Sequence, residues 1–218
     1  MTQDSKYSIF LFSKTSHPDV THIPILATRF FQPEIDFSAY DAIVLTSKQA
    51  VTALEKISSE WRVLPALCVA SKTADAVEKA GGKLLEAGDG YGDSLVDIII
   101  DNYASYRWLY PRPTVVASDF KERVSQAGVR MDDIIVYETY CNQACRDIKL
   151  PEDAILVFTS PSAITCFMKF FSFKPGYRVV VIGKTTAKAL PKNIKYQMPD
   201  LPTVDASVLL AEKLLQTL

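Results

Sequence analysis

A block of this chain occurs twice at a constant distance, and this repeat constrains the fold more than any other feature. Ala-Ile-Val-Leu-Thr46-Ser47 returns as Ile-Leu-Val-Phe-Thr159-Ser160, and Thr73 returns as Thr186, each 113 residues later. In both copies an apolar run ends in small hydroxyl residues and leads into a helical pattern, which predicts a strand, a turn and a helix N-terminus. The duplication predicts two similar lobes.

Strand-like and helical patterns alternate along the 218 residues, which predicts an α/β fold with parallel sheets flanked by helices. Predicted strands cover residues 7–12, 23–30, 42–46, 67–70, 83–87, 108–110, 134–140, 154–158, 178–182 and 196–198. Predicted helices cover residues 49–57, 73–80, 94–103, 119–127, 162–171, 185–190 and 206–215, the last with Asp205 as its cap.

The distribution of charge predicts how the two lobes share the chain. Residues 33–135 hold 11 Lys and Arg against 16 Asp and Glu, a net charge of −5, whereas the remainder holds 13 against 9, a net charge of +4. We therefore expect a discontinuous α/β domain of residues 1–30 and 138–218, with residues 33–135 inserted as a second α/β domain. The long predicted strands 23–30 and 134–140 form the expected two-stranded connection.

The repeated turn has the chemistry of an anion-binding site. A helix N-terminus offers unpaired backbone N–H groups and the positive end of the helix dipole, and the turn adds side-chain hydroxyls. Ligands of open parallel sheets bind at the C-terminal ends of the strands, where both copies of the Thr-Ser turn fall. The same hydroxyls could instead serve only as helix caps.

Composition predicts a cytoplasmic globular protein that binds neither nucleic acid nor membranes. The net charge of −1 gives no general attraction to either, no apolar run approaches the ~18 residues that span a bilayer, and the N-terminus lacks the pattern of a signal peptide. The four cysteines contain no Cys-x-x-Cys pair, so we expect reduced thiols. Nothing in the sequence requires more than a monomer.

Three motifs that could indicate other functions are incomplete. Gly183-Lys184-Thr185 lacks the earlier glycine of a phosphate-binding loop, because Arg178 occupies that position. The glycines of residues 88–92 lack the last glycine of a dinucleotide-binding turn. His17 and His22 lie in a loop without a carboxylate cluster, which disfavours a catalytic triad or a metal site. We expect a function without cofactor or metal.

Five motifs in order resemble the uroporphyrinogen-III synthase family over residues 40–218. Each is weak alone, but their order and spacing are fairly specific. They are Val44-Leu-Thr46-Ser47, Tyr110-Pro111-Arg112, Val136-Tyr137-Glu138-Thr139, Phe158-Thr159-Ser160-Pro161-Ser162, and the segment Ile182-Gly183-Lys184-Thr185-Thr186-Ala187-Lys188-Ala189-Leu190.

The resemblance implies a cyclising lyase of haem biosynthesis. Such enzymes close hydroxymethylbilane, a linear tetrapyrrole with acetate and propionate arms, into uroporphyrinogen III, with inversion of the terminal (D) pyrrole ring and loss of water. It also implies that Tyr137 donates a proton to the leaving hydroxyl, although this tyrosine could equally be a structural aromatic residue of a strand. The implied substrate-binding residues are Thr46, Ser47, Thr73, Arg112, Thr159, Ser160, Ser162, Lys184, Thr185 and Thr186.

A second function stays open from the residues alone. A non-catalytic two-lobed protein that binds or senses a small anion would use the same paired turns. An intracellular sensor usually carries an output or DNA-binding segment, and this chain has no basic patch to serve as one. Turnover of hydroxymethylbilane distinguishes the two functions.

Overall fold

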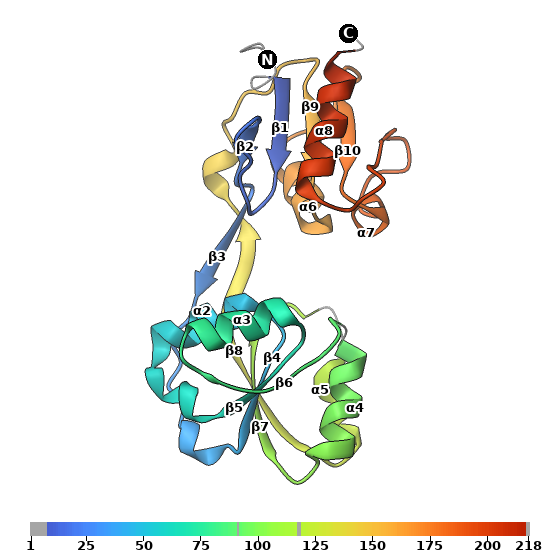
Figure 1. The fold of residues 1–218 in the computed structure, drawn as a ribbon. Coiled ribbons are helices and arrows are strands. Elements are labelled where there is room, and N and C mark those ends of the chain that lie inside the picture. Colours follow the sequence, from blue (N-terminus) through green and yellow to red (C-terminus); the bar gives the residue numbers. More distant parts are fainter. Residues whose placement is uncertain (1–7, 91, 117–118, 217–218) are drawn as a thin grey trace. The chain divides into compact units, whose positions relative to one another are not determined.

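The protein consists of two compact units in the computed structural model, which describes residues 8–90, 92–116 and 119–216 (Figure 1). Unit 1 combines Met1–Ala27 with Tyr140–Leu218, and unit 2 is Thr28–Thr139. The chain passes from one unit to the other within β3 (Leu26–Phe30) and β8 (Arg130–Cys141), which are hydrogen-bonded neighbours. That each unit folds as an independent domain, with an insertion at 33–135, stays a prediction.

Unit 2 is built on a six-stranded sheet with the order β3-β8-β7-β4-β5-β6, in which β8, β7, β4, β5 and β6 run parallel. This confirms the expected parallel α/β architecture. The other elements of this unit are β4 (Ala42–Leu45), β5 (Pro65–Cys68), β6 (Lys83–Ala87), β7 (Arg107–Pro113), η1 (Phe37–Ala39), η2 (Ser59–Val63), α2 (Lys48–Ile57), α3 (Ser71–Lys79), α4 (Gly92–Asn102) and α5 (Phe120–Gln126).

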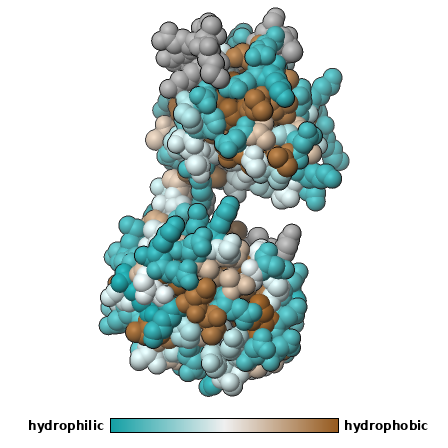
Figure 2. All heavy atoms as spheres, viewed as in Figure 1, coloured by the Kyte–Doolittle hydropathy of each residue, from teal (hydrophilic) through white to brown (hydrophobic). Residues whose placement is uncertain are grey.

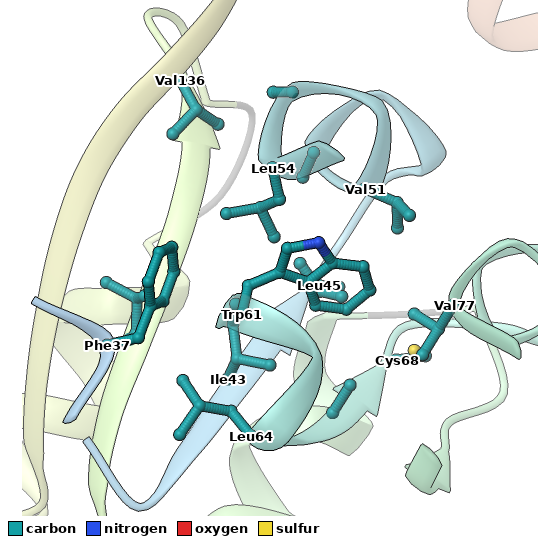
Figure 3. Packing of buried hydrophobic residues seen from close by; sticks show 14 of the residues in the cluster. Phe37, Ile43, Leu45, Val51, Leu54, Trp61, Leu64, Cys68, Val77 and Val136 are labelled. Atoms are coloured by element: carbon teal, nitrogen blue, oxygen red, sulfur yellow. The ribbon is translucent and has the colours of Figure 1, made fainter. Parts of the chain in front are cut away.

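Alternate side chains of the central strands supply two cores in unit 2, one on each face of the sheet. Ile43 and Leu45 of β4 pack with α2, α3 and the fully buried Trp61 (Figure 3). Ala42 and Val44 of the same strand pack against α4 and α5 on the opposite face. Packing on both faces therefore fixes β4 between the two helix layers, and with it the position of its C-terminal end.

Unit 1 has a four-stranded parallel sheet with the order β10-β9-β1-β2. One face packs against α6 and the other against α8. On the face drawn in Figure 2, each unit shows mostly hydrophilic residues with smaller hydrophobic patches. The elements of this unit are β1 (Ile9–Phe12), β2 (Thr21–Ile23), β9 (Ile155–Phe158), β10 (Arg178–Val181), η3 (Gln143–Cys145), α6 (Pro161–Phe170), α7 (Lys184–Ala187) and α8 (Val204–Leu215).

The structure confirms the duplication element by element. Helices α2 and α6 begin and end 113 residues apart, and so do strands β5 and β10. The two caps have almost the same backbone conformation, with φ −159° and ψ 143° at Ser47 and φ −159° and ψ 156° at Ser160. The repeat is therefore one strand-turn-helix-strand unit used twice.

The predicted strand 23–30 is wrong as one continuous element. It divides into β2 and β3 at Pro24, which has no backbone N–H to give to a sheet. Ile25 then donates its N–H to the carbonyl of Ile23 at 2.8 Å, which turns the chain between the two strands. The predicted strand 134–140 is longer than expected, because β8 begins at Arg130.

Three other predicted elements differ at their boundaries. The C-terminal helix α8 has Thr203 as its N-cap, whose Oγ1 accepts the N–H of Ala206 at 3.1 Å, and Asp205 lies inside the first turn. The predicted helix 185–190 is the single turn α7. The predicted strand 196–198 contributes only an isolated bridge between Gln197 and Val180.

The expectation of four reduced cysteines is wrong for one pair. Cys141 at the end of β8 and Cys166 on α6 form a disulfide, with their Cα atoms 5.2 Å apart, whereas Cys68 and Cys145 are free and buried. The two cysteines are 25 positions apart in the sequence, so their proximity could not be predicted from it, because it depends on α6 folding back beside the end of β8. The bond ties a connecting strand to the helix that Ser160 caps.

We expect removal of this disulfide to lower the free energy of unfolding by about 3.5 kcal/mol, the chain-entropy value for a loop of this length. The comparison is urea unfolding of the wild type with and without a thiol reductant. The double variant Cys141→Ser/Cys166→Ser is the control, because reductant should leave it unchanged. Equal stability of the oxidised wild type and the double variant would contradict this estimate.

Candidate active site

The C-terminal ends of the parallel strands in unit 2 bring together the first group of predicted site residues. Thr46 and Ser47 follow β4 directly, and Ser47 caps α2 by accepting the N–H of Gln49 at 3.1 Å. Arg112 lies near the end of the neighbouring strand β7, and Tyr137 follows along β8, paired in register with Pro113. Four predicted residues, far apart in sequence, therefore belong to one edge of one sheet.

Two tyrosines approach the Thr46-Ser47 turn from opposite faces of that sheet. Tyr137 packs in the core beneath α2, and its hydroxyl hydrogen-bonds with Ser47. Tyr110 packs in the core beneath α4 and α5, and its hydroxyl hydrogen-bonds with Thr46. Thr46 and Ser47 point to opposite faces because they are consecutive, so each receives a different phenol.

Burial determines the protonation of both phenols. Burial raises the pKa of Tyr137, the hydrogen bond with Ser47 lowers it in part, and Tyr110 nearby raises it again. Burial also raises the pKa of Tyr110, against the lowering effects of Thr46 and Arg112. Both tyrosines are therefore neutral proton donors throughout the physiological range of pH.

Arg112 is held by a carboxylate that the sequence did not indicate. Asp133 on β8 forms ion pairs with the Nε of Arg112 and the Nζ of Lys121 on α5. The pKa of Asp133 is lowered, because burial, which would raise it, is outweighed by the hydrogen bonds from Lys121 and Arg112. The register pairs Asp133 with Tyr110, so this charged group lies beside Tyr110, whose pKa Arg112 lowers and Asp133 raises.

The corresponding edge of unit 1 holds the second group. Thr159 and Ser160 follow β9, with the Oγ1 of Thr159 3.4 Å from the carbonyl of Phe12 and the Oγ of Ser160 accepting the N–H of Ala163 at 3.2 Å. Ser162 is exposed in the first turn of α6. Lys184 and Thr185 are exposed at the start of α7, after the neighbouring strand β10.

Thr73 and Thr186 occupy equivalent positions, each the third residue of a helix. Both side chains are only 4% exposed. The caps before them, Ala70 and Gly183, make no side-chain hydrogen bond to the helix. The two threonines therefore lie at helix N-termini whose caps do not compete for backbone N–H groups, and their contact with a ligand stays a prediction.

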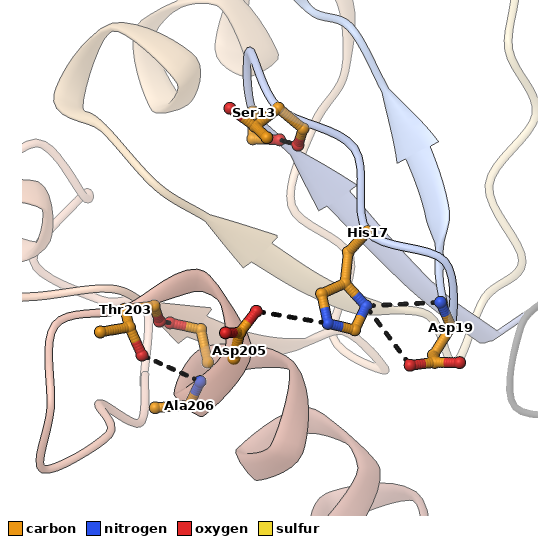
Figure 4. Close-up of polar contacts among 8 residues, drawn as sticks. Ser13, His17, Asp19, Thr203, Asp205 and Ala206 are labelled. Carbon is orange, nitrogen blue, oxygen red and sulfur yellow. Dashed lines mark hydrogen bonds and ion pairs between the residues drawn. The ribbon is translucent and has the colours of Figure 1, made fainter. Parts of the chain in front are cut away.

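His17 has two carboxylates beside it, contrary to the expectation of none (Figure 4). Its Nδ1 lies 3.6 Å from Asp19 and its Nε2 3.5 Å from Asp205, at the first turn of α8. His22 contacts the carbonyl of Ser13 at 2.9 Å. The contact between His17 and Asp205 ties the loop between β1 and β2 to α8. This loop, residues 13–20, joins two parallel strands without a helix.

Three residues at this edge of the sheet in unit 2 were not among the site residues predicted from the sequence: Tyr110, Lys121 and Asp133. Tyr110 was visible in the Tyr110-Pro111-Arg112 motif, whereas Lys121 and Asp133 carried no signal apart from their charge.

Across residues 8–90, 92–116 and 119–216, no group of three or more His, Cys, Asp or Glu side chains could hold a metal ion. Within the same residues, no helix has the length and apolar character needed to cross a membrane.

Comparisons with known proteins agree on one family. The sequence profile of the family described as uroporphyrinogen-III synthase HemD matches residues 17–208. A direct search of curated protein sequences finds no match.

Two solved structures show the same fold. The uroporphyrinogen-III synthetase of Helicobacter pylori 26695 is 22% identical, with a TM-score of 0.80 over 95% of this chain and 99% of that one. A mutant uroporphyrinogen III synthase of the extremely thermophilic bacterium Thermus thermophilus is 15% identical, with a TM-score of 0.56 over 91% of each chain.

Proposed function

Because the chain belongs to the uroporphyrinogen-III synthase family, we propose that the residues assembled at its strand ends close hydroxymethylbilane to uroporphyrinogen III. The family is one of cyclising lyases in tetrapyrrole biosynthesis. The reaction expels the terminal hydroxyl as water and inverts the last pyrrole ring as the macrocycle closes. The protein must fold the linear chain into the reactive conformation and supply one proton to the departing oxygen.

The observation that carries this assignment is the position of Tyr137, which packs beneath α2 and interacts with Ser47, the N-cap of that helix. Ser47 already accepts the backbone N–H of Gln49, so its own hydrogen is free to be donated to the phenol oxygen. Tyr137 then keeps its phenolic hydrogen for the leaving hydroxyl of the substrate. A neutral phenol that is oriented in this way is a weak acid suited to hydrogen-bond donation.

The hydroxyls and backbone N–H groups of the repeated turns bind the acetate and propionate arms. In unit 2 this assigns Thr46, Ser47, Thr73 and Arg112 to the substrate, and in unit 1 it assigns Thr159, Ser160, Ser162, Lys184, Thr185 and Thr186. Anions favour helix N-termini, which α2, α3 and α6 provide next to these residues. We also propose that the enzyme is a cytoplasmic monomer that uses no metal or organic cofactor.

The competing function, binding of a small anion without chemistry, makes a different quantitative prediction. An enzyme consumes many equivalents of hydroxymethylbilane, whereas a binding protein retains at most a stoichiometric amount. We expect substrate generated in situ to be converted in large excess over protein. Saturation of the protein with no conversion above the rate without protein would favour the binding function.

The two equivalent threonines provide a matched test of the repeated turns. Thr186→Val keeps the branched shape but removes the hydroxyl, so substrate binding should weaken by about 0.5 to 1.5 kcal/mol, or up to about 3 if the partner is a carboxylate. Thr73→Val should act in the same way from unit 2. The control is Thr52→Val on the exposed face of α2, where Oγ1 contacts only the carbonyl of Lys48. Unchanged KM in both site variants would show that these hydroxyls are structural.

The pH dependence of kcat tests the protonated phenol. Burial raises the pKa of Tyr137 above its usual value, so the donor form is present at all lower pH and is lost only as pH rises through that pKa. We expect kcat to stay level between about pH 6 and 9 and to fall above about pH 10. A fall in kcat between pH 6 and 8 would assign proton donation to a different group.

A further inference from the structure

Three charged side chains form a group near the C-terminal end of β7: Arg112 of β7, Asp133 of the neighbouring strand β8 and Lys121 of α5. Asp133 is 16% exposed, and its two oxygens are divided between two cations, with Oδ2 paired to Arg112 and Oδ1 to Lys121. Arg112 also donates from Nη1 to the carbonyl of Pro113 at 2.9 Å. The guanidinium group is therefore fixed from two sides, by a carboxylate and by the backbone.

The contacts leave a defined set of donors for a ligand. Nε and Nη1 of Arg112 are engaged, whereas Nη2 has no partner among the residues that the structure describes. Lys121 uses one of its three N–H groups on Asp133 and makes no other described contact. With two cations and one carboxylate the group has a net charge of +1, which attracts an anion.

The position of this group relates it to the tyrosines. Asp133 is the register partner of Tyr110, whose hydroxyl contacts Thr46 at the repeated turn. A ligand carboxylate that meets Arg112 and Lys121 would therefore extend from a molecule held beside Tyr110 and Tyr137.

We propose that Arg112 and Lys121 together bind one carboxylate arm of the substrate, and that Asp133 is the positioning residue that holds the two cations in place. The inference rests on the proposed function, and it adds Lys121 to the binding residues. Asp133 occupies the Nε of Arg112, so Arg112 cannot offer Nε and Nη2 together in a bidentate contact. The substrate carboxylate therefore receives one contact from Nη2 of Arg112 and one from Nζ of Lys121.

The neighbouring residue supplies a matched control. Asp132 lies one position earlier on β8 and pairs with Arg107, at the beginning of β7 rather than at its end. Arg107 directs both Nε and Nη2 to the same oxygen of Asp132, at 3.2 and 2.8 Å. Asp132→Asn thus removes the same chemical group from an Arg–Asp pair whose arginine lies at the other end of β7.

The sign of the effect distinguishes positioning from simple electrostatics. Asp133→Asn raises the net charge of the group from +1 to +2, so charge attraction alone would lower KM for an anionic substrate. If Asp133 positions the cations, KM instead rises by about tenfold, the low end for charge-assisted hydrogen bonds, with kcat nearly unchanged. Lys121→Gln should raise KM to a similar extent, and Asp133→Glu should recover part of the loss.

The test measures KM and kcat for the wild type and the four variants, together with fluorescence titration of uroporphyrin III, the oxidised product. We expect Asp133→Asn and Lys121→Gln to weaken both KM and the titrated affinity, while Asp132→Asn changes neither. An unchanged or lower KM in Asp133→Asn and an unchanged KM in Lys121→Gln would overturn the inference. If Asp133→Asn fails to fold, Lys121→Gln decides alone, because this half-exposed side chain carries little of the core.

The proposed function can fail separately. A wild type that forms no uroporphyrinogen III contradicts the proposed function, whatever the variants show. A fully active wild type whose Lys121 and Asp133 variants behave like Asp132→Asn contradicts only the proposal that Arg112 and Lys121 bind a carboxylate arm.

Discussion

Replacing Tyr137 with phenylalanine is expected to lower kcat by about 10- to 100-fold, toward the low end of general-acid effects. The change removes one hydroxyl and leaves the ring that packs beneath α2. If Tyr137 donates the proton to the leaving oxygen of the substrate, the variant removes that donor. Steady-state kinetics with substrate generated in situ measures the effect.

A matched control separates catalysis from packing. Tyr103→Phe removes a hydroxyl from the same unit at a ring that packs against Trp108, near the beginning of β7. We expect Tyr103→Phe to keep full activity and Tyr137→Phe to keep the thermal stability of the wild type. A loss of thermal stability that parallels the loss of kcat would make Tyr137 a structural residue, and full activity of Tyr137→Phe would remove it from the mechanism.

The second large effect concerns the core that supports the repeated turn. Trp61→Ala is expected to lower the free energy of unfolding by about 3 to 5 kcal/mol, the range for large aromatic residues in cores. Trp61 is 0% exposed, packs beside Ile43, Leu45 and Leu54, and donates its indole N–H to Glu55 at 2.8 Å (Figure 3). The variant therefore creates a cavity under β4 and α2 and removes the indole donor from Glu55.

Urea unfolding measures this loss, with Val63→Ala as the control. Val63 lies two residues away on η2 and is 61% exposed, so its truncation should change stability by less than about 0.5 kcal/mol. A loss below about 1 kcal/mol in Trp61→Ala would show that the core relaxes around the missing ring. Activity per folded molecule should stay close to that of the wild type at low temperature.

The repeated architecture could be predicted from the sequence because its signals are local. Apolar runs, small hydroxyl residues and helical periodicity lie within about fifteen residues of one another in each copy, and the offset between the copies is constant. The break at Pro24 was also a local signal, since proline lacks the N–H that a continuous strand needs. The apolar pattern alone predicts one strand over 23–30, whereas Pro24 separates β2 from β3.

The contacts that the sequence did not reveal depend on how strands are placed side by side. Asp133 meets Arg112 and Lys121 only because β7 and β8 pair in one register and α5 packs nearby. Cys141 meets Cys166 only because α6 lies against the end of β8. Neither proximity follows from spacing along the chain, since the partners are 12 to 25 positions apart in the sequence.

The isomer composition of the product tests most directly whether the protein is a uroporphyrinogen-III synthase. Hydroxymethylbilane closes without a catalyst to the uninverted isomer, so hydroxymethylbilane generated in situ, then oxidised and separated by isomer, reports what the protein adds. We expect the share of the type III isomer to rise with protein concentration toward complete conversion, and Tyr137→Phe to require more protein to reach the same share. A type III share that stays at the level of the control without protein, at every protein concentration, would contradict the proposed synthase activity.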